Sequence, residues 1–144
     1  SAINSTLKIA QETKKRIKRK GIMKEELVSI ETAILAYKIG FNIPCIYFID
    51  KEGDISSVMD YIGDTFEDKF EMAKEFIVMF LPTQSLLQKY LREMHNLNVN
   101  VNYYDDKITP IRWAVFIDTN YIPCKGDTYE QALEKGLQEA LNTL

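Results

Sequence analysis

The sequence predicts an α+β fold in which an antiparallel sheet of about four strands, made of two hairpins, packs with helices in the order α-α-β-β-α-β-β-α. Residues 97–104 alternate apolar and polar side chains, which is the period of a half-buried strand. Residues 83–95 and 128–141 carry apolar side chains at helical spacing. A chain of 144 residues, 46% of them hydrophobic, is long enough to bury a core without a metal or a disulfide.

Residues 1–22 differ from the rest of the chain in charge. They hold seven basic side chains and one acid, a net charge of +6, whereas residues 23–144 have a net charge of −9. We therefore expect a basic N-terminal arm or helix at 1–22 and a single α+β domain at 23–144. Two alternatives to a binding role remain for the arm: a solvated tether, or upstream or vector-derived sequence before a natural start at Met23. The side chains that would contact nucleic acid are Lys14, Lys15, Arg16, Lys18, Arg19 and Lys20.

The first helix of the domain has clear signals at both ends. Ser29 is a favoured N-cap residue, and Gly40 stands where a left-handed residue is needed after the last turn. A hairpin with strands near 45–50 and 54–62 is expected next. Its turn is Asp50-Lys51-Glu52-Gly53, in which Gly53 is free to take positive φ.

Residues 63–81 give mixed signals. Phe66, Phe70, Ala73 and Ile77 have the spacing of a helical turn or two, whereas residues 76–81 are equally suited to a short strand.

The segment PTQSLLQKYLREMH is predicted to form a helix that begins after Thr83 and ends at Asn96. His95, the one histidine of the chain, falls at its C-terminal end, where the helix dipole favours a cation. The other side of this helix carries more hydrogen-bonding groups than packing requires. Its candidate partner-binding residues are Gln84, Gln88, Arg92 and Glu93.

A second hairpin follows, with strands at 97–104 and 111–118 and a turn at Asp105-Asp106-Lys107. The last helix starts at Thr128 with capping-box spacing to Gln131, and Gly136 inside it indicates close packing. One face of this hairpin is the best candidate for a binding surface, for a peptide or for stacked bases. Its residues are Asn98, Asn100, Asn102, Arg112 and Phe116.

The sequence predicts no catalytic residues, no metal site and no cofactor. It lacks the P-loop, the dinucleotide fingerprint and the nucleophile elbow. One His and two separated Cys do not supply the ligands of a zinc site, and Tyr61 stands where a calcium loop needs a bidentate Glu. A Cys–His pair would have to join His95 to Cys45 or Cys124, and Cys is more often a small buried hydrophobic residue.

The cellular setting follows from what is missing. There is no apolar run long enough to span a membrane and no signal-peptide core, so we expect a cytoplasmic protein with no membrane partner. The two cysteines are then expected as reduced thiols, although the sequence does not settle whether they pair.

Three segments together resemble a family of small phage and prophage proteins of gut anaerobic bacteria. They are IETAILAYKIGFNIPCIYFID, PTQSLLQKYLREMHN and DTYEQALEKGLQEAL. The resemblance spans roughly residues 27–144, and Tyr90 stands where the family usually has Trp. The family brings no established activity, so the resemblance implies a phage or mobile-element setting only.

Residues 111–141 also resemble, in outline, the antitoxin of HicAB-type pairs, in which strands are followed by a capped helix. From all of this we expect a non-enzymatic phage or prophage accessory protein that binds a protein partner. The alternative is a nucleic-acid-binding or HicB-antitoxin-like module that uses the basic arm and the sheet face.

Overall fold

The chain folds into two compact units, each of which is built from separate segments of the sequence. A computed structural model describes residues 25–103, 113–122 and 126–144. Among these, unit 1 comprises Glu25 and Phe41–Pro82, and unit 2 comprises Glu26–Gly40 and the described residues from Thr83 to Leu144. From Glu26 onward the chain begins unit 2, then builds Phe41–Pro82 of unit 1, and then returns to complete unit 2.

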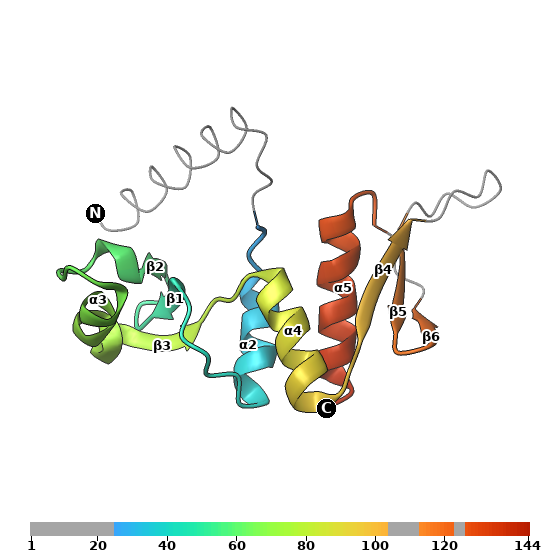
Figure 1. Cartoon of the computed structure of the whole chain (residues 1–144), viewed down its shortest axis with the longest axis horizontal. Coiled ribbons are helices and arrows are strands. Elements are labelled where there is room, and N and C mark those ends of the chain that lie inside the picture. The colour runs from blue at the N-terminus through green and yellow to red at the C-terminus, as the bar shows by residue number, and fades with distance from the viewer. Residues whose placement is uncertain (1–24, 104–112, 123–125) are drawn as a thin grey trace. The chain divides into compact units, whose positions relative to one another are not determined.

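Unit 1 is a small antiparallel sheet packed with helical turns. Its strand order is β2-β1-β3, so that β1 is central (Figure 1). Phe48 of β1 is fully buried with Val58 and Ala73, and partly buried aromatic side chains pack around them. The elements are β1 (Tyr47–Asp50), β2 (Ile55–Ser57), the 3₁₀ turn η1 (Val58–Asp60), α3 (Phe66–Ala73), the 3₁₀ turn η2 (Lys74–Phe76) and β3 (Ile77–Phe80).

The β1–β2 turn is organised by the carboxylate of Asp50. Its Oδ1 accepts hydrogen bonds from the backbone N–H groups of Glu52 and Asp54, both at 3.0 Å, and its Oδ2 accepts from the Ser56 hydroxyl at 2.8 Å. Burial alone would raise the pKa of Asp50, but the hydrogen bonds from Asp54, Ser56 and Glu52 outweigh it and lower the pKa. Gly53 has φ +82°, as the turn prediction requires.

Unit 2 has a second three-stranded antiparallel sheet, in the order β4-β5-β6. Its long helix α5 crosses β4 and β5, while α2 and α4 lie on the other side of α5 (Figure 1). The valines that face α5, Val99 and Val115, are buried together with Leu133 and Leu137 of the helix. The elements are α2 (Ile30–Lys38), α4 (Gln84–His95), β4 (Val99–Tyr103), β5 (Trp113–Ile117), β6 (Asn120–Ile122) and α5 (Tyr129–Asn142).

The helix ends predicted from the sequence are confirmed by the backbone. Ser29, Thr83 and Thr128 each cap a helix by accepting a hydrogen bond from a first-turn N–H through the side chain. Asn96 is left-handed, with φ 54°, and Gly40 has φ +94°. These signals work because each joins residues that are close in the sequence.

The α+β class is confirmed, whereas the strands are distributed differently from the expectation. The sequence predicts one sheet of about four strands, and the structure has two sheets of three strands each. Each predicted hairpin has gained a third strand: β3 lies in the segment with mixed signals, and β6 returns along β5 after a turn at Asp118, which has φ 56°. The helix expected in 1–22 and the turn at Asp105-Asp106-Lys107 lie outside the described residues.

Replacing Gly136 by Ala is expected to destabilise unit 2. A Cβ at this position would lie 2.6 Å from Cγ1 of Val115 and 2.9 Å from Cγ1 of Val99, so the helix would have to move away from the sheet. We expect a net loss of about 1 to 3 kcal/mol, because overpacking outweighs the gain in helix propensity. Urea unfolding followed by the fluorescence of Trp113, the one Trp of the chain, measures it. The exposed Glu139→Ala is the control, and an equal effect of the two changes would contradict the close packing.

Replacing Asp50 by Ala is expected to weaken the β1–β2 hairpin by about 1 to 2 kcal/mol at neutral pH, because the turn loses its acceptors. Since the folded-state pKa lies below the ordinary 3.8, this stabilisation is fully present above about pH 4 and is lost as the pH falls through the folded-state pKa. Urea unfolding followed by the NMR signals of Phe48 and Ile49 at two pH values tests this. Asp54→Ala is the control, because Asp54 enters these hydrogen bonds through its backbone. A difference between variant and wild type that is no smaller at pH 2 than at neutral pH would contradict the assignment.

Candidate interaction surface

Two of the four polar residues predicted on α4 make hydrogen bonds within unit 2. Gln84 is only 6% exposed, and its Nε2 donates to the carbonyl of Glu130 at 2.9 Å and to Oε1 of Glu134 at 3.0 Å. Gln88 donates through Nε2 to the carbonyl of Val99 at 2.6 Å. These two predicted partner-binding residues therefore hold α4 to α5 and to β4. Of the four residues predicted on this helix, only Arg92 and Glu93 are exposed and available to a partner.

The Gln88 contact also affects the free edge of the sheet. β4 is an edge strand, and an edge strand offers unpaired backbone groups to any added strand. Because the carbonyl of Val99 already accepts from Gln88, the beginning of this edge is occupied. A partner that approaches this sheet therefore has better access to its face than to this end of its edge.

The hydrogen bonds of Gln84 belong to a network centred on Glu134. Oε2 of Glu134 accepts from the backbone N–H and the hydroxyl of Ser29, both at 3.0 Å, and from the hydroxyl of Thr32, which is fully buried. Gln138 in turn donates to Oγ1 of Thr32 at 3.0 Å. One carboxylate of α5 thus links the start of α2 to the start of α4. Nothing in the sequence marked Glu134, because its partners lie 50 to 105 residues away.

The face of the sheet that is turned away from α5 carries most of the predicted binding residues. Asn100, Phe116 and Tyr121 are cross-strand neighbours on β4, β5 and β6. Asn100 and Asn102 are exposed, and the rings of Phe116 and Tyr121 meet edge to face with centroids 5.7 Å apart. We call this group, Asn100, Asn102, Phe116 and Tyr121, the sheet face.

Asn98, which was also predicted for this face, has a different position. Asn98 lies just before β4, where Asp118 Oδ1 accepts from its backbone N–H at 3.1 Å and the N–H of Asp118 donates to its carbonyl at 2.7 Å. Asn98 thus belongs to the end of the β4–β5 pairing. Arg112 lies outside the described residues, as do the nucleic-acid candidates Lys14, Lys15, Arg16, Lys18, Arg19 and Lys20.

Tyr121 was not among the predicted residues. The short segment Asn120–Ile122 follows a turn directly after the strand that contains Phe116. A three-residue strand shows too little alternation to be recognised, although the polar residues Asp118, Thr119 and Asn120 after an apolar run are a turn signal. That turn would have placed Tyr121 opposite Phe116.

The surroundings of Cys45 and His95 do not favour a catalytic Cys–His pair. Cys45 belongs to unit 1, is 8% exposed and donates its thiol to the carbonyl of Ile43 at 3.2 Å. Burial raises the pKa of Cys45 to about 12, which suppresses the reactive thiolate at neutral pH. His95 lies edge to face against Tyr90 in unit 2, with its Nε2 buried. Cys124 lies outside the described residues.

Over the described residues, no group of three or more His, Cys, Asp or Glu side chains is placed to hold a metal ion, and no helix is long and apolar enough to cross a membrane. Comparison of the chain with protein-family models, with curated proteins and with solved structures finds no match.

Replacing Glu134 by Gln is expected to destabilise unit 2 by about 2 kcal/mol, because an amide NH₂ would face donors that now share a charged acceptor. Urea unfolding followed by Trp113 fluorescence gives the free energy. Glu139→Gln makes the same chemical change at an exposed position of α5 and is expected to stay within about 0.5 kcal/mol of wild type. Equal stabilities of the two variants would show that the network does not hold the helices together.

Proposed function

We propose that this protein is a non-enzymatic accessory protein that binds a protein partner through the sheet face of unit 2. The supporting observation is the row Asn100–Phe116–Tyr121, in which two aromatic rings lie beside the exposed amide of Asn100. Aromatic rings provide large contact areas at protein interfaces. Asn side chains both donate and accept hydrogen bonds, as the backbone of a bound polypeptide requires.

Charge favours a protein over a nucleic acid at this surface. The described part of unit 2 has eight acidic and four basic side chains, and none of the four residues of the sheet face is charged. Nucleic-acid binding depends largely on Lys and Arg contacts to phosphates. A nucleic-acid or HicB-antitoxin-like role stays the alternative, and it would have to draw its cations from residues 1–22 or from other undescribed segments.

The setting is part of the same proposal. The resemblance of residues 27–144 to small phage and prophage proteins supports a role during infection or in a mobile element, in the cytoplasm of a bacterial host. In that setting a binding protein needs no reaction of its own, because it acts by occupying a surface of the host or phage protein that it meets.

A photo-crosslinking experiment tests the proposal in host cells. A benzoylphenylalanine at position 121 is expected to form one dominant adduct with a protein, because Tyr121 is 48% exposed on the sheet face. The same group at position 94, where Met94 is exposed on α4, is the control and is expected to give none of that adduct.

The second step uses the isolated partner and the full chain. Asn102→Asp together with Tyr121→Ser is expected to weaken binding by about tenfold or more, as for residues at an interface centre. The free energy of unfolding should stay close to wild type, because both side chains are exposed. Unchanged binding by this double variant, or an adduct that contains only nucleic acid, would refute the proposed function.

A further inference from the structure

Unit 1 carries a surface of different chemistry. Between Phe41 and Pro82 there are nine acidic and three basic side chains, a net charge of −6 in the smaller of the two units. Several large apolar side chains are exposed on the same unit: Ile62 is 82% exposed, Met72 53% and Phe76 41%. Single exposed apolar residues are ordinary, but several in a unit of this size are typical of an interaction surface.

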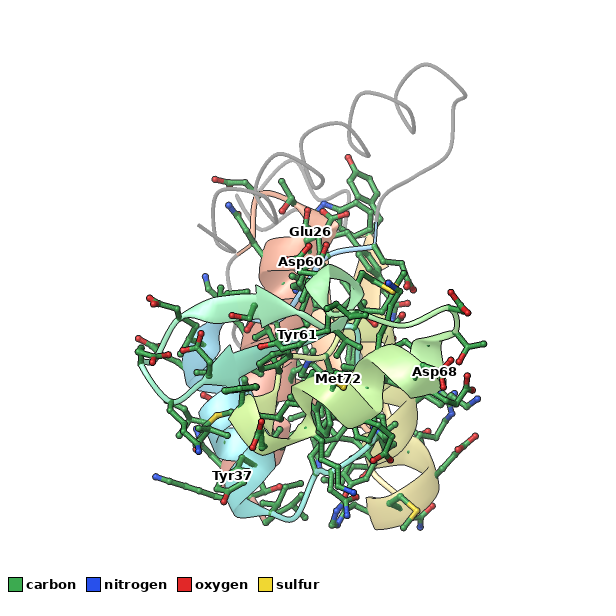
Figure 2. All side chains as sticks on the ribbon, turned by 90° about the vertical axis from the view of Figure 1, so that its left-hand side faces the viewer. Glu26, Tyr37, Asp60, Tyr61, Asp68 and Met72 are labelled. Carbon is green, nitrogen blue, oxygen red and sulfur yellow. The ribbon has the colours of Figure 1, made fainter. Side chains whose placement is uncertain are left out.

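Tyr61 lies near both acidic and exposed apolar side chains of unit 1. It follows the exposed Asp60, and its ring packs against that of Phe76, with centroids 5.9 Å apart and planes at 31°. Figure 2 looks toward this side of unit 1, with Asp60, Tyr61 and Met72 labelled on it. We call Asp60, Tyr61, Met72, Glu75 and Phe76 the Tyr61 surface.

The carboxylates near Tyr61 make this surface electronegative. The pKa of the Tyr61 hydroxyl is raised by partial burial and then by the charges of four carboxylates, Asp50, Asp60, Glu52 and Glu75. The three lysines between Phe41 and Pro82 offset this negative charge only in part. Lys69 donates to the backbone carbonyl of Tyr61 at 3.0 Å, Lys74 pairs with Glu71, and Lys51 lies in the turn beside Glu52.

Such a surface selects its ligand by charge and shape. The negative charge repels nucleic acids and anionic membranes. The carboxylates do not converge as metal ligands do, since no metal-binding group of three acidic, His or Cys side chains is found within the described residues. A cationic side chain, in contrast, is attracted by the carboxylates and also by the faces of aromatic rings. Apolar neighbours such as Met72 add contact area for the flanking residues of a polypeptide.

We propose that the Tyr61 surface binds a basic segment of a partner protein, with a Lys or Arg side chain against the rings of Tyr61 and Phe76 and an apolar residue against Met72. Charge complementarity supports this occupant. The site is separate from the sheet face and does not depend on the function proposed for it, because the two surfaces share no residue.

Titration of the full chain with a short fluorescent peptide of alternating Lys and Leu tests the proposal by anisotropy. Binding is expected to weaken steeply with salt, and a Glu-Leu peptide of equal length is expected not to bind. Asp60→Asn with Glu75→Gln should lower the affinity for the Lys-Leu peptide by about tenfold. Asp64→Asn with Glu67→Gln removes the same charge elsewhere on unit 1 and should change it by less than about threefold.

A matched pair of methionine variants tests the proposed apolar contact with Met72. Met72→Gln is expected to lower the affinity by about three- to tenfold, whereas Met94→Gln, at an exposed methionine of unit 2, should leave it unchanged. Equal effects of the two charge pairs, equal effects of the two methionine variants, or binding of the Glu-Leu peptide would each overturn the proposal.

The chain's own basic segment is the competing occupant. In the full chain, Lys14, Lys15, Lys18 and Lys20 are replaced together by Gln, and the titration is repeated. An unchanged affinity for the Lys-Leu peptide supports a partner protein. A marked rise would mean that residues 1–22 already occupy the Tyr61 surface and would overturn the assignment to a partner. The sheet-face variant Asn102→Asp with Tyr121→Ser should bind the peptide as wild type does, which separates this test from that of the proposed function.

Discussion

The carboxylate of Glu134 is the interaction on which the architecture of unit 2 depends. It accepts from Ser29 and Thr32 at the start of α2 and from Gln84 at the start of α4. Between these two helices the chain builds Phe41–Pro82 of unit 1. Closing a loop of that length costs conformational entropy, so strong contacts must hold its ends in unit 2. The bridge between Leu27 and Thr83 and the hydrogen bond from Gln84 N–H to the Glu26 carbonyl at 2.8 Å do this beside the network.

This constraint decides which polar residues remain for recognition. A buried polar group must be hydrogen-bonded, and Gln84 and Thr32 satisfy that requirement within the network. Gln88 is likewise used by the backbone of β4. The hydrogen-bonding capacity on α4 is therefore mostly structural. The amides of Asn100 and Asn102 are exposed on a sheet whose opposite face is fixed by α5, and a rigid support of this kind suits a binding surface.

The sequence predicted the parts of this fold that are set by near neighbours. The caps at Ser29, Thr83 and Thr128, the left-handed Asn96 and the alternating strand after it each depend on residues within a few positions. The division into two sheets did not follow from such signals, because β3 and β6 are short and their pairing depends on where the rest of the chain lies. The same limit applies to the candidate site. Period two identified Asn100, Asn102 and Phe116, whereas the burial of Gln84 depends on Glu134, 50 residues further along the chain.

The aromatic core of unit 1 stabilises its fold, whereas the net negative charge of the unit has no such evident role. An excess of like charge destabilises a compact state through self-repulsion. Asp50 compensates by organising its turn, and Glu67 and Asp68 lie in the first turn of α3, where the helix dipole favours acids. Glu52 lies in the same turn as Asp50, and Glu75 lies in the first turn of η2. Both still raise the pKa of the Tyr61 hydroxyl by their charge. A cationic ligand at the Tyr61 surface would relieve part of this repulsion when it binds.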